Sequence, residues 1–77
     1  MTRTFQDDDL LLWEAYAAAP RSGEDHGARI VFHCLTDRTR RARVLEQDSS
    51  RSGIEQRLTD ADDEELAELL DAAEPIR

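Results

Sequence analysis

The sequence lacks lysine and asparagine altogether and has a single cysteine, Cys34, among its 77 residues. One cysteine excludes an intrachain disulfide, and chains without disulfides are typical of reducing compartments. Residues 10–19, LLLWEAYAAA, are similar to the core of a signal peptide, but three aspartates precede them where positive charge belongs, and the run is too short to span a bilayer. We therefore expect a cytoplasmic protein with no membrane association.

Positive charge is scarce and comes from arginine alone. Ten arginines stand against 18 acidic residues, which gives a net charge of −8 and makes nucleic acid and anionic lipid poor partners. An acidic, lysine-free composition of the halophile type fits a cytoplasm with molar salt. Screening there reduces the range of charge repulsion to about 3 Å. A GC-rich genome would bias the codons toward the same residues, so both explanations stay open.

Large apolar side chains are also few, since alanine supplies much of the hydrophobic 39%. A chain of this length forms one domain, residues 1–77, near the lower size limit for folding without disulfides or metals. We expect marginal stability for an isolated monomer, and therefore help from a second copy, a partner or the solvent.

The strongest β signal lies in residues 30–35, IVFHCL. In a strand, Ile30, Phe32 and Cys34 point to one face. Val31 and Leu35 point to the other. A strand that is apolar on both faces requires cover on both, so what lies over each face decides the fold and indicates where a partner binds.

Three strands are predicted, near residues 10–17, 29–36 and 40–46. The first is ambiguous, because residues 7–20 also fit a helix with aspartates in its first turn and Pro20 after its end. Trp13 and Tyr16 favour a strand, as does the need for a neighbour that pairs with the central strand. We expect Trp13 in the core beneath a helix, with an interface anchor as the alternative.

The third strand has two unlike faces. Ala42 and Val44 share one of them. Arg41, Arg43 and Leu45 share the other, which is expected to be largely wet because two of its three residues are arginines.

The clearest pattern in the chain is an amphipathic helix near residues 62–73. Its apolar stripe recurs at helical spacing and consists of Leu66, Leu69, Leu70 and Ala73. Asp62 is expected to cap this helix, with Glu65 completing a capping box. In contrast, residues 47–57, with several serines and Gly53, are expected to form an irregular connection.

The predicted fold class is therefore α+β, a three-stranded antiparallel β-meander with one C-terminal amphipathic α-helix packed on one face. This arrangement leaves the sheet face of Val31 and Leu35 uncovered. A symmetric dimer through that face or through an edge strand, or a protein partner bound there, is the simplest cover.

The layout of the chain is also informative. Phe5, Asp7 and Trp13 are followed by the segments ARIVF, RRAR and DEELAELLDAAEPIR. In this order they resemble a group of short uncharacterised bacterial proteins with a tryptophan-bearing first strand, an arginine-rich hairpin and a C-terminal helix that ends in proline. The resemblance covers most of the chain and supports a strand for the first apolar segment. It implies no activity and no functional residue.

No set of side chains fits a catalytic centre, so an enzyme is not expected. Cys34 and His33 are neighbours on a strand and point to opposite faces, and Cys34 is expected to be buried; His26 in the preceding loop is the other candidate base. With Asp25 these residues lack the paired spacing of a zinc site. The acidic run from Asp60 lacks the glycine of a calcium loop and fits a helix N-terminus. We expect no metal and no cofactor.

The basic cluster consists of Arg38, Arg40, Arg41 and Arg43. Guanidinium groups bind phosphates and carboxylates well, but we expect these mainly to pair with the chain's own acids. Together with Val31 and Leu35 they are the candidate partner contacts. The leading hypothesis is a small acidic, non-enzymatic protein-interaction domain that self-associates or binds a partner through the uncovered sheet face. The alternative is a regulatory module that binds RNA or a phosphate ligand through the arginine hairpin, residues 38–43.

Overall fold

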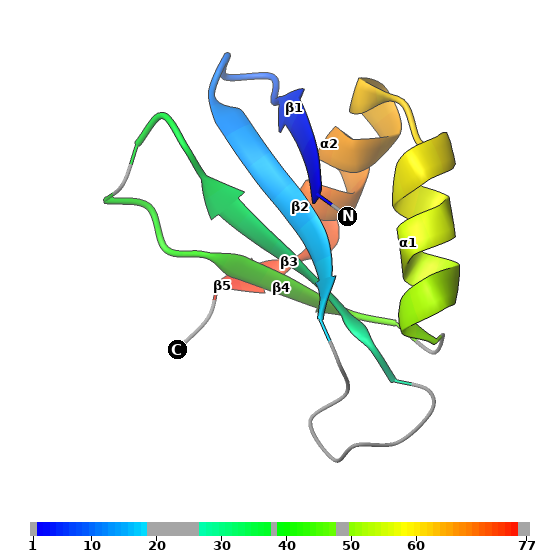
Figure 1. The fold of residues 1–77 in the computed structure, drawn as a ribbon. Coiled ribbons are helices and arrows are strands. Elements are labelled where there is room, and N and C mark those ends of the chain that lie inside the picture. Colours follow the sequence, from blue (N-terminus) through cyan, green and yellow to red (C-terminus); the bar gives the residue numbers. More distant parts are fainter. Residues whose placement is uncertain (1, 19–26, 38, 48–49, 76–77) are drawn as a thin grey trace.

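The computed structural model describes residues 2–18, 27–37, 39–47 and 50–75. In chain order the elements are β1 (Thr2–Gln6), β2 (Leu12–Ala18), β3 (Arg29–Cys34), β4 (Arg43–Glu46), α1 (Arg51–Asp60), α2 (Asp63–Ala72) and β5 (Glu74–Pro75). The strands form one antiparallel sheet against which the helices pack (Figure 1). The α+β class is confirmed. The prediction of three strands and one helix is wrong, because the described residues form five strands and two helices.

The order of strands across the sheet, β1-β2-β3-β4-β5, is the same as their order in the chain. The central pair, β2 and β3, sets Trp13 opposite Cys34 and Ala15 opposite Phe32. Burial alternates along β2, with Trp13 and Ala15 buried and the residues between them more exposed. This period of two is that of a strand, so the helix alternative for this segment is wrong.

The strand β1 was not predicted, since only Phe5 in this lead-in is apolar enough to anchor it. The Phe5 ring is 2% exposed and meets the Phe32 ring edge to face, with centroids 6.1 Å apart. One aromatic side chain is too short a pattern to show a period of two. The β-branched Thr2 and Thr4, which both precede Phe5, were the available signal.

The helix α1 corrects a second expectation, because residues 51–60 lie largely in the segment predicted to be irregular. The Ser50 hydroxyl accepts a hydrogen bond of 3.1 Å from the Gly53 amide and caps the helix. Ile54 and Leu58, four residues apart, are both buried in the core. The serines and Gly53 concealed this helical spacing.

The helix α2 agrees with its prediction. The Asp62 carboxylate accepts a hydrogen bond of 2.8 Å from the Glu65 amide, and the acidic first turn suits the positive end of the helix dipole. The apolar stripe is buried as expected, with Leu66 and Leu70 almost inaccessible. After the helix, Glu74 and Pro75 pair with β4 as a short edge strand.

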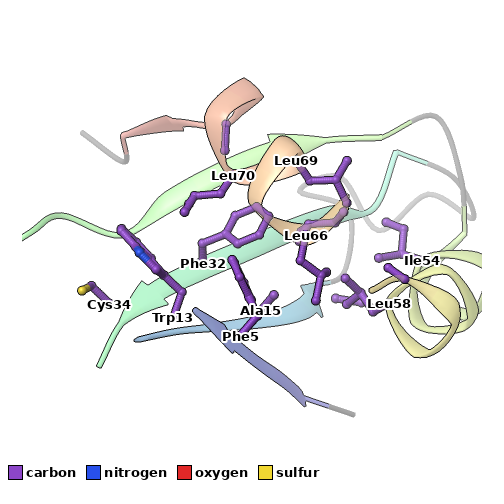
Figure 2. Close-up of a cluster of buried hydrophobic side chains, with 14 of the residues drawn as sticks. Phe5, Trp13, Ala15, Phe32, Cys34, Ile54, Leu58, Leu66, Leu69 and Leu70 are labelled. Carbon is purple, nitrogen blue, oxygen red and sulfur yellow. The ribbon is translucent and has the colours of Figure 1, made fainter. Parts of the chain in front are cut away.

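Both helices pack on the same face of the sheet, and their buried leucines and isoleucine share one core with Phe5, Trp13 and Phe32 (Figure 2). The face of β4 that was expected to be wet also belongs to this core side. Leu45 packs against the core, and the Arg43 guanidinium lies 5.8 Å from the centre of the Trp13 ring. That expectation is wrong because the arginine covers an aromatic ring instead of facing solvent.

Candidate interaction surface

The opposite face of the sheet, here called the open face, is covered by neither helix. By strand alternation and register it consists of Thr2, Thr4, Gln6, Leu12, Glu14, Tyr16, Ala18, Arg29, Val31, His33, Val44, Glu46 and Glu74. Both helices contribute buried side chains to the core on the other side of the sheet, and neither lies over the open face.

Leu12 and Leu35 form an exposed apolar pair at one end of the open face. The Leu35 amide donates a hydrogen bond of 2.8 Å to the Leu12 carbonyl, so the pairing of β2 with β3 continues one residue beyond β3. The side chains of Leu12 and Leu35 are 44% and 45% exposed. Two leucines opposite each other on a sheet are ordinary neighbours in a core, and their exposure marks a place where another surface can bind.

The centre of the open face is better filled. Val31 stands opposite both Tyr16 and Val44 in the register, and these neighbours leave it only 7% exposed. Beside them the His33 ring stacks on the Tyr16 ring at 5.7 Å, and the Tyr16 hydroxyl lies 3.1 Å from His33 Nε2. Of the two apolar residues proposed as partner contacts, Leu35 is therefore the accessible one, whereas Val31 contributes mainly packing.

Leu10, in the turn between β1 and β2, was missed as a surface residue. It is 72% exposed and has a left-handed backbone, with φ 66°. The Leu10 amide bonds to the Asp7 carbonyl and the Asp7 amide to the Leu11 carbonyl, which is a three-residue hairpin loop with its last residue in the position that glycine usually occupies. The available signal in the sequence was a leucine at a turn position that usually holds glycine. We call Leu10, Leu12 and Leu35 the leucine patch.

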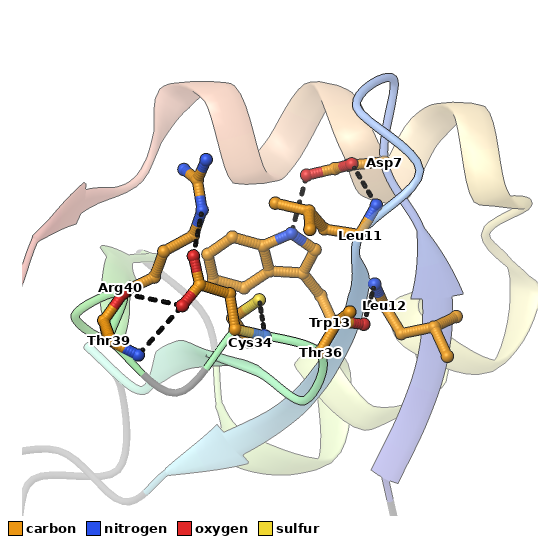
Figure 3. A network of polar contacts seen from close by, with 9 residues as sticks. Asp7, Leu11, Leu12, Trp13, Cys34, Thr36, Thr39 and Arg40 are labelled. Carbon is orange, nitrogen blue, oxygen red and sulfur yellow. Dashed lines mark hydrogen bonds and ion pairs between the residues drawn. The ribbon is translucent and has the colours of Figure 1, made fainter.

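Asp7 organises this turn. One carboxylate oxygen accepts hydrogen bonds of 2.9 Å from the Asp9 and Leu11 amides, and the other accepts one of 2.7 Å from the Trp13 indole (Figure 3). Burial alone would raise the pKa of Asp7, but the bonds from Leu11, Trp13 and Asp9, with the charge of Arg40, outweigh it and lower the pKa. The carboxylate thus ties the turn to the core tryptophan.

The turn after β3 is held in a similar way by Asp37. Its carboxylate accepts hydrogen bonds from the Thr39 hydroxyl and amide and lies 3.5 Å from Arg40 Nε, and these contacts lower its pKa. The Thr36 hydroxyl accepts a bond of 2.9 Å from the Leu12 amide, which joins the two turns at the same end of the sheet (Figure 3). The leucine patch therefore lies beside two turns whose conformations are held by hydrogen bonds to the Asp7 and Asp37 carboxylates.

The arginine cluster does not form a single basic surface. Arg43 turns to the core side, where its Nη1 donates a bond of 3.2 Å to the carbonyl of Leu70 near the end of α2. Arg40 contacts Asp37, and Arg41 is exposed beside it. Arg38 lies outside the described residues. The prediction that these arginines pair with the chain's own acids thus fits Arg40, whereas Arg43 contacts a backbone carbonyl and an aromatic ring instead.

Charge is distributed unevenly between the two sides of the molecule. The helices α1 and α2 carry seven acidic and two basic residues, a balance of −5. The open face carries Glu14, Glu46, Glu74 and Arg29, a balance of −2. An open depression of about 350 Å³ between β1 and α2 is lined by Gln6, Asp8, Asp63, Glu64, Ala67, Glu68 and Asp71, and so repels anions.

The candidates for chemistry are not brought together. Cys34 is buried and accepts a long bond of 3.4 Å from the Asp37 amide, while His33 is exposed on the other face. Asp25 and His26 lie outside the described residues. In the part of the chain that is described, no three His, Cys, Asp or Glu side chains are arranged to hold a metal ion. The acidic run from Asp60 spans the link between the helices and the start of α2.

Comparisons with known proteins add no family to this description. No protein-family model matches the chain, and neither curated proteins nor solved structures give a significant match. None of the described helices has the length and apolar character needed to cross a membrane.

Proposed function

We propose that the chain is a non-enzymatic protein-interaction domain that binds another protein surface through its open face, with the leucine patch as the main apolar contact. The observation that carries this proposal is the pair Leu12 and Leu35, opposite each other on the side of the sheet away from both helices. Burying two half-exposed leucines supplies the apolar centre that stable interfaces need.

The turn conformation of Leu10 supports the same surface. A left-handed backbone costs a leucine on the order of 1 kcal/mol relative to glycine, so nothing in the fold of the turn favours this residue. A large apolar side chain that is strained and exposed at once is explained by contact with a partner.

The arginine hairpin is a weaker candidate for function. Binding of RNA or a phosphate would require several guanidinium groups on one surface. Arg43 instead covers Trp13, and Arg40 is engaged by Asp37. The described arginines therefore do not form a shared site for RNA or a phosphate, and we place the apolar contact of the interaction surface on the leucines.

Photo-crosslinking in the cells that produce the protein tests the proposal. A photoreactive amino acid in place of Leu12 or Leu35 should give discrete protein adducts, because both side chains would lie inside the interface. The matched control replaces Glu68, which is exposed on α2, and should give none. Equal labelling from all three positions, or none from the leucines, would contradict the assignment of function to the open face.

A further inference from the structure

We infer that the occupant of the open face is a second copy of the same chain, related to the first by a two-fold axis parallel to the strands and passing between β2 and β3. The inference rests on the proposed function and names its partner. The position of the axis follows from the charges of the two turns, because the acidic turn lies on the β2 side of the axis and the basic turn on the β3 side.

The two turns beside the leucine patch carry opposite charges. Asp8 and Asp9 are exposed in the turn that precedes β2, and Arg40 and Arg41 are exposed in the turn that follows β3. These turns lie at the same end of the sheet, joined by the bond from the Leu12 amide to the Thr36 hydroxyl. A two-fold axis between β2 and β3 places the acidic turn of each copy against the basic turn of the other. The surface is therefore complementary to itself.

The same axis matches the residues at the centre of the face. Glu14 on β2 stands opposite His33 on β3, and Tyr16 stands opposite Val31. Rotation exchanges β2 with β3, so Glu14 of one copy faces His33 of the other, and each Tyr16 ring faces a valine. Leu12 of one copy meets Leu35 of the other at the end of the sheet. Glu14 gains an ionisable partner in His33, and the two exposed leucines, Leu12 and Leu35, cover each other across the axis.

The rest of the surface makes other approaches unfavourable. Two copies that each carry a charge of −8 repel each other most strongly where the helices and the depression gather the acids. The open face is less acidic. Aligned packing of the two sheets gives four layers, with helices outside and sheets inside.

The area of the open face limits how tightly two copies can bind each other. Four strands about 4.8 Å apart and about six residues long cover roughly 400 Å² in projection. Stable complexes bury about 800 Å² of accessible surface on each partner. We therefore expect a weak dimer, with a dissociation constant on the order of micromolar or above.

Charge exchange between the turns tests the arrangement on the full chain by sedimentation equilibrium. One variant, Asp8→Arg with Asp9→Arg, makes both turns basic. The other, Arg40→Glu with Arg41→Glu, makes both turns acidic. Each alone should self-associate about tenfold or more weakly than the wild type, because like charges would meet across the axis. An equimolar mixture should restore association, because each basic turn then meets an acidic one.

The variant with Asp8→Arg and Asp9→Arg is the most informative. Each substitution changes the charge by two, so the net charge goes from −8 to −4. If only overall repulsion mattered, this variant would associate more tightly than the wild type, and that result would overturn the inference. Failure of the mixture to associate better than either variant would overturn it as well. Circular dichroism of each variant verifies that the fold is kept.

Sedimentation of the wild-type chain distinguishes self-association from the proposed function of binding a protein through the open face. If the wild type remains monomeric up to millimolar concentration in both about 0.15 M and about 1 M salt, the second copy is excluded. Crosslinks from Leu12 and Leu35 to other proteins would then still support an interaction domain. A wild-type dimer whose Leu12 and Leu35 crosslink only to a second copy supports both.

Discussion

The indole nitrogen of Trp13 donates a hydrogen bond of 2.7 Å to the carboxylate of Asp7, six residues earlier in the chain. This bond connects the first hairpin turn to the largest side chain of the core. The same carboxylate also accepts hydrogen bonds from the Asp9 and Leu11 amides of the turn. One ionised group therefore stabilises both the turn and the position of the core tryptophan.

The lowered pKa of Asp7 predicts a loss of stability in acid. Because the pKa in the folded state lies below its ordinary value of 3.8, the ionised form stabilises the fold above about pH 4. This contribution disappears as the pH falls through the folded-state pKa. Asp7→Asn should cost about 1–2 kcal/mol at neutral pH and flatten the acid limb of the stability curve. Urea unfolding between about pH 2 and 7 measures both effects.

The matched control for this prediction is Asp8→Asn in the same turn. Asp8 is exposed, and its substitution should leave both the stability and its acid dependence close to those of the wild type. Equal behaviour of the two variants would show that the ionised Asp7 carboxylate stabilises the fold no more than an exposed aspartate does.

Arg43 is expected to stabilise the fold through two contacts, one with the Trp13 ring and one with the carbonyl of Leu70. Arg43→Ala should cost about 1–2 kcal/mol and shift the fluorescence of the single tryptophan. Arg41→Ala, two residues away and exposed, should change the stability by less than about 0.5 kcal/mol. Thermal unfolding followed by tryptophan fluorescence measures the difference in stability between the two variants. Equal stability of the two would show that Arg43 is only a solvated charge.

Leu10 predicts opposite changes in stability and association. Leu10→Gly should raise the free energy of unfolding by about 0.5–1 kcal/mol, because glycine adopts the left-handed backbone without strain. The same variant should weaken self-association, because it removes one leucine of the patch. Leu10→Ala is the control, since it trims the side chain without relieving the backbone. Unchanged association in both variants would remove Leu10 from the interface.

The composition makes a prediction about salt. If the acidic, lysine-free surface reflects adaptation to molar salt, the melting temperature should rise by several degrees between dilute buffer and about 2 M sodium chloride, since screening weakens the repulsion among the acids of the helices. A flat response would favour codon bias as the origin of the composition. Differential scanning calorimetry at fixed protein concentration measures the shift.

The elements that could be predicted are those with repeated apolar spacing. The stripe of Leu66, Leu69 and Leu70 predicts α2, and the alternation of Ile30, Phe32 and Cys34 predicts β3 with the correct faces. β1 could not be predicted because its only anchor is Phe5. α1 was hidden because Gly53 and several serines interrupt the spacing of its buried residues.

The open face of the sheet could be predicted in outline and not in detail. The two-sided character of residues 30–35 indicates an open face, and Leu35 is exposed on it. The burial of Val31 depends on its cross-strand neighbours, which the sequence does not place in register. Arg43 has an aromatic partner thirty residues away, and such a pairing across strands leaves no local pattern.

The identity between strand order and chain order has a consequence for how the molecule is made. As the chain leaves the ribosome, every strand from β2 to β4 can pair with one that has already emerged, so most backbone pairing needs only short loops to close. The helices follow β4, and they carry the side chains that shield Phe5, Trp13 and Phe32 from water. Until the helices have emerged, the nascent sheet therefore exposes these aromatic side chains in addition to its open face, and a chaperone would meet it in that interval.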